Sequence, residues 1–470
     1  MNFAEFRFWV YWSLGMAVLL ALRGLLSLWK PSNKVLIGRY DRLALLGLGL
    51  FLLGCVSLLT VAIFITVSLI TYTGLRLYLR HEGHRRWIVL SALIPLQLLP
   101  LLYFKYSHFI VNDIFRMQVG GLLGLMIPVG LSFYTFQLVG FVVDTVMTRK
   151  PLPPFIDFMN FAGFFPQIVA GPIERREHLL PQVSRFRFNW DRSALQAGLP
   201  WIVLGLYLKI GLADNLANHF DPSSIDNPFL IWMNNLVFGL RIYYDFAGYS
   251  FIALGMARCL GIHLTINFTS PYISRNAQEF WRRWHITLST WFRDYLYIPL
   301  GGNRVRMWAL NILVVFVVSG IWHGAGWNFI LWGAIWGVAL IAWIVSNPQK
   351  PWPAPIAWFL TMVTAFYAWL CFYETRTGVL VQKLATISNP FNYTVANWQA
   401  ARTAIDPTSA FVLGGILFLC VVTLIMEWAS VHKAGRPYAF LLHPVTMFVL
   451  IILTILLAPA EQNDFIYFAF

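Results

Sequence analysis

Long apolar stretches, separated by short polar segments, run along most of the chain. A helix of about 20 residues crosses the hydrocarbon core of a bilayer, so stretches near this length predict membrane-spanning helices. They lie at 8–29, 42–79, 86–104, 122–146, 193–213, 228–260, 306–345, 355–374, 410–429 and 441–459. Since 42–79 and 306–345 are each long enough for a helical hairpin, the pattern predicts an all-α polytopic membrane protein with about eleven or twelve transmembrane helices.

Two other segments are rich in aromatic and polar residues and do not fit as spans. Segment 154–175 contains Phe-Pro-Gln and Ala-Gly-Pro breaks, which favour a re-entrant or interfacial piece. Segment 276–298 mixes Arg, Trp, Phe and Tyr at helical spacing, which predicts a helix lying in the inner membrane interface.

The composition agrees with a membrane protein. Hydrophobic residues make up 59% of the chain and charged residues only 11%. A soluble domain carries about 25% charged residues, so this chain lacks the side chains that would cover a water-exposed surface. A single membrane-embedded domain over 1–470 is therefore expected.

The net charge of +14 comes from basic residues in the loops between apolar stretches. Segments 30–42, 80–87, 148–192 and 258–306 are rich in Arg and Lys, whereas 214–227 and the end of the chain are acidic. This distribution follows the positive-inside rule, which places the basic segments in the cytoplasm. The lipid bilayer, with its anionic lipids, is thus the expected partner, and no nucleic acid is expected.

The same rule places both ends of 306–345 on the cytoplasmic side, so this stretch must turn back once. The turn is expected near Gly320–Gly326, where three glycines can open a helix. Segment 42–79 must turn back once for the same reason.

The turn at 320–326 carries the first candidate for chemistry, His323, within Trp322-His323-Gly324. A histidine inside an apolar stretch is costly unless it has a partner or lines a cavity. Burial favours the neutral imidazole, which can accept a proton from a hydroxyl. The alternative is a structural histidine that joins two helices through a hydrogen bond.

A second candidate region alternates arginines with aromatic residues, from Phe280 through Trp284-His285 to Arg304. Arginines beside aromatic rings at a membrane face can hold phosphates or an anionic carrier. The alternative is anchoring, because Trp and Tyr favour the interface and Arg pairs with lipid headgroups. The residues of interest are Arg282, Arg283, Trp284, His285, Arg293 and Asn303.

Two apolar stretches contain further polar residues. Asp245 needs a neutralising partner or a polar cavity, and an ion pair with Arg241 or Arg258 is as plausible as a catalytic role. The polar side chains of 128–137, Tyr134 and Gln137 among them, could line a pocket or join helices.

Other chemistries find no support. The sequence has no phosphate-binding Walker loop, no Gly-x-Ser-x-Gly elbow and no His-Glu-x-x-His zinc helix. His285 and His323 have no carboxylate or cysteine at a plausible metal-ligand spacing, so no metal is expected.

Together these segments resemble the membrane-bound O-acyltransferase family, in particular its bacterial branch of alginate and peptidoglycan O-acetylation proteins. Phe280–Arg304 and Trp322-His323-Gly324 carry most of the resemblance. Phe164-Phe165-Pro166-Gln167 and Ala170-Gly171-Pro172-Ile173 add to it, and it extends from about residue 100 to Phe465-Ile466-Tyr467-Phe468. The first 100 residues match less clearly, and Gln137 stands where alginate-type sequences often carry histidine.

The resemblance implies a bundle of spans with re-entrant pieces around a central passage. It implies N-terminal helices over 1–100, a catalytic core over 122–345 and C-terminal helices over 355–470. His323 corresponds to the active-site histidine of the family, and His285 to its second histidine on the cytoplasmic side. Trp322, Gln137, Tyr134, Asp245, Trp284, Arg282, Arg283, Arg293 and Asn303 are the expected substrate-binding residues.

The implied activity is acyl transfer, most simply of acetyl, in the bacterial inner membrane. The donor is an acyl thioester such as acetyl-CoA, with no bound cofactor. The acceptor is a hydroxyl of an extracytoplasmic glycan or partner protein, and a separate extracytoplasmic acetyltransferase is the expected partner. The alternatives are a transporter or flippase for an activated sugar or lipid, an assembly scaffold, and a D-alanyl transferase of the same family.

Overall fold

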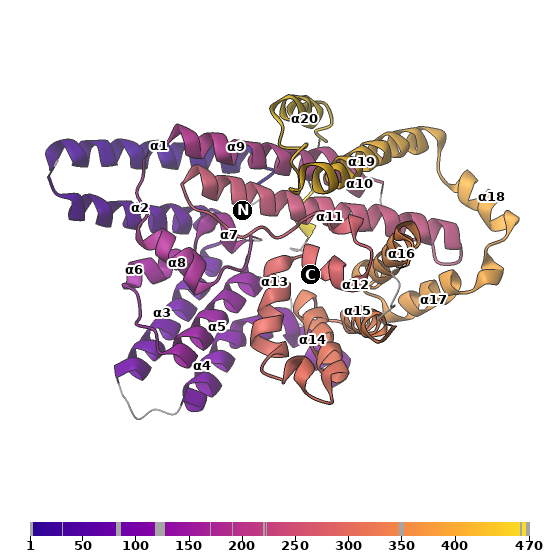
Figure 1. The fold of residues 1–470 in the computed structure, drawn as a ribbon, viewed down its shortest axis with the longest axis horizontal. Coiled ribbons are helices and arrows are strands. Elements are labelled where there is room, and N and C mark those ends of the chain that lie inside the picture. Colours follow the sequence, from indigo (N-terminus) through magenta and orange to yellow (C-terminus); the bar gives the residue numbers. More distant parts are fainter. Residues whose placement is uncertain are drawn as a thin grey trace. The chain divides into compact units, whose positions relative to one another are not determined.

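The computed structural model describes residues 3–30, 32–80, 86–117, 127–169, 171–189, 191–219, 221, 223–346, 352–460 and 463–466. Within these residues the regular structure is entirely helical (Figure 1). Eight of the described helices are long and apolar enough to cross a membrane, and α14 and α20 are apolar but shorter. The chain is therefore an all-α polytopic membrane protein, as the sequence predicts.

The chain folds as two compact units, each described by itself. The first unit consists of 1–202 and 249–266, and the second of 203–248 and 267–470. The expectation of one domain over 1–470 stays a prediction.

The first unit begins with long helices. They are α1 (Phe6–Trp29), α2 (Lys34–Gly54), α3 (Leu58–Arg80), α4 (Arg86–Leu101) and α5 (Leu131–Thr148). The hairpin predicted over 42–79 is confirmed, since α2 and α3 are joined by a short connection at 55–57. The span predicted at 122–146 corresponds to α5, and 122–126 lie outside the described residues.

Short helices follow in the first unit. They are α6 (Phe155–Ala162), α7 (Phe165–Ile168) and α8 (Arg176–Ser184). Segment 154–175 is thus broken as its prolines and glycines predict, and its Ala170 lies outside the described residues.

Two helices contribute to both units. The first is α9 (Arg192–Leu206), which continues through a π-helical turn (Tyr207–Ala213) into α10 (Asp214–Ala217). The second is α11 (Pro228–Cys259). A side chain on Gly198 would lie 2.5 Å from the Gly255 carbonyl oxygen, and one on Gly248 would lie 2.8 Å from the Gly205 carbonyl oxygen. In each unit, glycine therefore lets α9 and α11 approach at backbone distance.

The second unit holds the remaining helices. They are α12 (Ala277–Arg283), α13 (Ile286–Phe292), α14 (Trp308–His323), α15 (Trp327–Ser346), α16 (Ala354–Tyr373), α17 (Thr377–Ser388), α18 (Val395–Ala404), α19 (Pro407–Ala434) and α20 (Pro444–Leu456). The apolar pattern predicts α16, α19 and α20. The apolar pattern does not predict the short helices α17 and α18, because neither is an apolar stretch of spanning length.

The predicted turn near Gly320–Gly326 is confirmed. α14 ends at His323 and α15 begins at Trp327, and the two helices pack against each other as a hairpin (Figure 1). A side chain on Gly320 would lie 2.1 Å from the Phe329 carbonyl oxygen, and one on Gly333 would lie 2.3 Å from that of Phe316. Glycine at both positions thus allows the close packing that fixes the end of α14.

The prediction of one helix over 276–298 is wrong. The helix is interrupted at Trp284-His285, between α12 and α13, and His285 has φ of 42°. A left-handed residue cannot continue a right-handed helix, although the spacing of arginines and aromatics carries on past the break.

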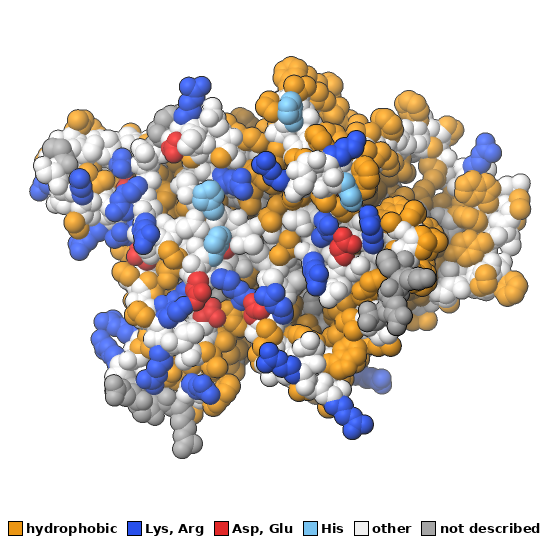
Figure 2. Space-filling model, in the orientation of Figure 1, with side chains coloured by type: hydrophobic (Ala, Val, Ile, Leu, Met, Phe, Trp, Pro, Cys, Tyr) orange, Lys and Arg blue, Asp and Glu red, His pale blue; other side chains and the backbone are white. Residues whose placement is uncertain are grey.

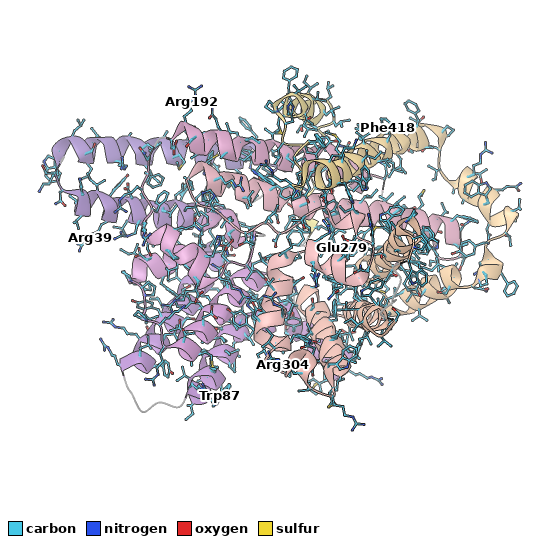
Figure 3. All side chains as sticks on the ribbon, viewed as in Figure 1. Arg39, Trp87, Arg192, Glu279, Arg304 and Phe418 are labelled. Atoms are coloured by element: carbon cyan, nitrogen blue, oxygen red, sulfur yellow. The ribbon has the colours of Figure 1, made fainter. Side chains whose placement is uncertain are left out.

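Much of the surface is apolar, as expected for helices that contact lipid. Hydrophobic side chains gather over α19 and α20 in Figure 2. Phe411 and Phe418 of α19 are 84% and 66% exposed, and Figure 3 shows Phe418 on the outer surface of this helix.

Candidate active site

His323 is the last residue of α14 and is buried, with 2% exposure. Its imidazole packs edge-on against Trp332 of α15 and Phe372 of α16, with ring centroids 4.9 and 5.2 Å apart. Trp322 packs against it at 5.0 Å. Three helices therefore hold the imidazole in an aromatic, desolvated setting.

His285 lies at the break between α12 and α13 and has no exposed surface. Phe246 of α11 packs edge-on against its ring at 4.7 Å, and Trp322 does so at 5.9 Å. Trp322 therefore contacts both histidine rings, and the second unit brings together the two histidines that the sequence singles out.

Burial lowers the pKa of His285 from its ordinary 6.5 to about 3. The neutral imidazole is thus favoured by folding, because the unfolded chain binds a proton at a higher pH than the folded chain does. The stability that this histidine contributes is complete above pH 6.5 and is lost as the pH falls toward 3.

We therefore expect that lowering the pH from about 7.5 to about 5 lowers the thermal unfolding midpoint of the purified protein in detergent. His285→Gln should reduce this pH-dependent shift, whereas His432→Gln should not, because His432 is exposed on α19. An equal shift in wild type and His285→Gln would contradict the burial argument.

An aromatic cluster borders the two histidines. Trp284 stacks on Phe280 at 5.6 Å with an interplanar angle of 11° and packs against Trp369 at 5.0 Å. Trp284 is fully buried, so in this structure it is part of the packed interior beside His285.

The arginines of the second candidate region occupy different settings. Arg283 forms an ion pair with Glu279 at 3.0 Å and donates to the Thr269 carbonyl at 2.9 Å. Arg293 pairs with Asp294 at 2.7 Å. Arg282 and Asn303 are exposed. Figure 2 shows basic side chains beside acidic ones over α12, and Figure 3 marks Glu279 there.

Asp245 is neutralised by a partner that the sequence pattern does not indicate, Lys209. Its Oδ1 lies 2.7 Å from Nζ of Lys209, which also donates to Asp214 at 2.6 Å. Asp245 Oδ2 accepts from the Ile466 backbone N–H at 2.8 Å. The ion pair of Asp245 is thus with Lys209, and Asp245 also interacts electrostatically with Arg241, one of the two expected arginines. Its Oδ2 fixes the described end of the chain.

Gln137 and Tyr134 lie in the first unit, whereas both histidines lie in the second. Gln137 donates to the Phe161 carbonyl at 2.6 Å and accepts from Gln167. Tyr134 is buried against Phe64, with ring centroids 5.5 Å apart. These contacts fit the helix-joining alternative, and a role toward substrate stays a prediction.

Glu427 of α19 is a buried carboxylate that the sequence motifs do not single out. Its carboxylate is fully buried and accepts from the Tyr243 hydroxyl at 2.9 and 3.0 Å. Tyr438 lies 3.1 Å from that hydroxyl and accepts from the Ser270 backbone N–H. A lone carboxylate inside the apolar stretch 410–429 is the signal that could have found it.

The described residues contain no group of three or more His, Cys, Asp or Glu side chains that could hold a metal ion.

Comparison with known proteins identifies the family. The membrane-bound O-acyltransferase family model matches residues 148–373, which include His285 and His323. A probable alginate O-acetylase from Azotobacter vinelandii is 31% identical over 399 residues, which cover 80% of this chain and 78% of that relative. The chain belongs to the membrane-bound O-acyltransferase family. The family resemblance inferred from the motifs is thereby confirmed.

Other relatives match this membrane-bound O-acyltransferase over shorter stretches. A peptidoglycan O-acetyltransferase from Helicobacter pylori is 34% identical over 330 residues, 61% of this chain and 62% of the relative. A teichoic acid D-alanyltransferase from Streptococcus thermophilus is 28% identical over 321 residues, 57% of this chain and 75% of the relative. The match therefore spans less than two thirds of the length of the Helicobacter relative.

Proposed function

We propose that this protein is an O-acyltransferase that moves an acetyl group from a cytoplasmic thioester donor to a hydroxyl on the other side of the membrane. The observation that carries the proposal is the placement of His323. A buried imidazole at the end of α14, in contact with Trp322, which also contacts the buried ring of His285, is suited to proton transfer in a water-excluded site.

In the proposed reaction His323 accepts the proton of the acceptor hydroxyl. The hydroxyl oxygen attacks the carbonyl carbon of the thioester, and an ester bond forms as the carbon–sulfur bond breaks. The thiolate leaves and takes up the proton, which regenerates neutral His323. No bound cofactor is needed, and acetyl-CoA is the proposed ultimate donor.

His285 is proposed to orient the donor. Arg282, which is exposed on α12, is proposed to attract the anionic groups of the donor together with Arg283 and Arg293. The glutamate and aspartate partners of Arg283 and Arg293 would then compete with the donor for these guanidinium groups.

The proposed location is the bacterial inner membrane. The names of the relatives suggest an extracytoplasmic glycan as acceptor, alginate or peptidoglycan among the choices, reached directly or through an extracytoplasmic acetyltransferase partner.

D-alanyl transfer from a carrier protein is the second candidate. The similarity to the Streptococcus thermophilus D-alanyltransferase supports it. Both reactions open a thioester and form an ester, so the same histidines would serve either.

The test supplies purified protein in proteoliposomes with acetyl-CoA and, separately, with a D-alanyl thioester of a carrier protein. Fragments of alginate or peptidoglycan serve as acceptors. We expect free thiol to appear in step with ester on the acceptor for one donor. Movement of a labelled activated sugar or lipid without thiol release would instead favour a transporter.

A further inference from the structure

His285 owes its position to an unusual backbone conformation. Its φ of 42° and ψ of 54° lie in the left-handed region, which residues with a side chain seldom adopt. Such a conformation persists only where the surrounding structure holds it.

Segment 267–269 supplies contacts on the α13 side of His285. The Asn267 carbonyl accepts from the Ile286 backbone N–H at 2.9 Å. The side-chain Oδ1 of Asn267 accepts from the Thr287 hydroxyl at 2.7 Å and from the Thr287 backbone N–H at 3.2 Å. The two residues that follow His285 are thus both tied to Asn267.

The same segment also holds the α12 side. The Thr269 backbone N–H donates to the Arg283 carbonyl at 3.0 Å, and Arg283 donates back to the Thr269 carbonyl at 2.9 Å. Phe268, between these two anchors, packs against Trp284 at 5.1 Å. Segment 267–269 therefore forms hydrogen bonds with the chain on both the α12 side and the α13 side of the break.

These contacts are made in a dry environment. Asn267 is 1% exposed and Thr287 is 3% exposed. Removing the Thr287 hydroxyl takes away the shorter of the two hydrogen bonds that Asn267 Oδ1 accepts from Thr287, with no water at hand to replace it. A change at Asn267 or Thr287 should therefore move the backbone of His285.

We infer that Asn267 is a positioning residue for His285: through Ile286 and Thr287 it holds the left-handed backbone that directs the imidazole toward Phe246 and Trp322. The inference rests on the proposed function for the role of His285 toward the donor. It adds a residue that lies outside both histidine motifs.

Thr287 offers a matched pair of substitutions. Thr287→Val removes the hydroxyl that donates to Asn267 Oδ1 and keeps the shape of the side chain. Thr287→Ser keeps the hydroxyl. We expect Thr287→Val and Asn267→Ala to lower kcat/KM for acetyl-CoA by about 10- to 100-fold, the cost of a small displacement of a reacting group. Thr287→Ser should stay within about twofold of wild type.

A second readout does not depend on activity. Diethyl pyrocarbonate modifies accessible neutral imidazoles, and mass spectrometry reports the rate at each histidine. Thr287→Val should raise the rate at His285 by about tenfold, through local opening, and leave exposed His432 unchanged. Thr287→Ser should leave both rates unchanged.

The two readouts separate the possible failures. If Thr287→Val matches Thr287→Ser in modification of His285, the inference is overturned. If modification changes as expected while wild-type protein releases no thiol from any thioester, the positioning stands and the proposed function fails. If the protein is active, the double variant Thr287→Val/His285→Ala must have the same activity as His285→Ala alone. A lower activity of the double variant would overturn the inference.

Discussion

His323→Ala is expected to lower the rate of thiol release from acetyl-CoA by about 10²- to 10⁴-fold, the usual contribution of a general base. The ring is buried among Trp322, Trp332 and Phe372, so no bulk water stands ready to take over its role. Initial rates in proteoliposomes that contain acceptor measure the effect.

The matched control is His432→Ala, which removes an exposed histidine of α19. It should keep the wild-type rate. The thermal unfolding midpoint of His323→Ala must stay near that of wild type if the lost rate reflects chemistry. A lost rate accompanied by a collapsed midpoint would assign His323 to the structural alternative, a residue that joins helices.

Lys209→Met is expected to have the largest effect on stability. Lys209 lies between two buried carboxylates, Asp214 and Asp245, at 2.6 and 2.7 Å. Removing one partner of a buried ion pair costs about 3–5 kcal/mol, because the remaining charge is left without compensation. Denaturant titration in detergent micelles measures the free energy of unfolding.

The control for this variant is Lys433→Met, at an exposed lysine near the end of α19, which should change little. The triple variant Lys209→Met/Asp214→Asn/Asp245→Asn removes all three charges and should recover most of the lost stability. A triple variant no more stable than Lys209→Met would show that uncompensated charge is not the cause.

The long apolar helices and the hairpins could be predicted from the sequence. Apolar stretches of spanning length and the cluster of glycines before Trp327 identify the α14–α15 hairpin, because length and backbone freedom are local properties. The two histidines could be singled out for the same reason, since a polar residue in an apolar stretch carries its own signal.

Features that depend on tertiary contacts could not be predicted. Contacts with Asn267 hold the break between α12 and α13 at His285. The spacing of arginines and aromatic residues does not indicate this break. Lys209 stands alone in the apolar stretch 193–213, and only the fold shows that it pairs with Asp245. Arg241 and Arg258 are closer to Asp245 in sequence, which favoured an arginine over Lys209 as the ion-pair partner.

The central claim is that His323 serves acyl transfer from a thioester on one face to a hydroxyl on the other. The direct measurement uses oriented proteoliposomes with acetyl-labelled CoA outside and a mixture of alginate and peptidoglycan fragments inside. Wild type should release thiol outside and place an equal amount of label on the fragments inside, and His323→Ala should do neither. Label that crosses without thiol release, or full transfer by folded His323→Ala, would contradict the claim.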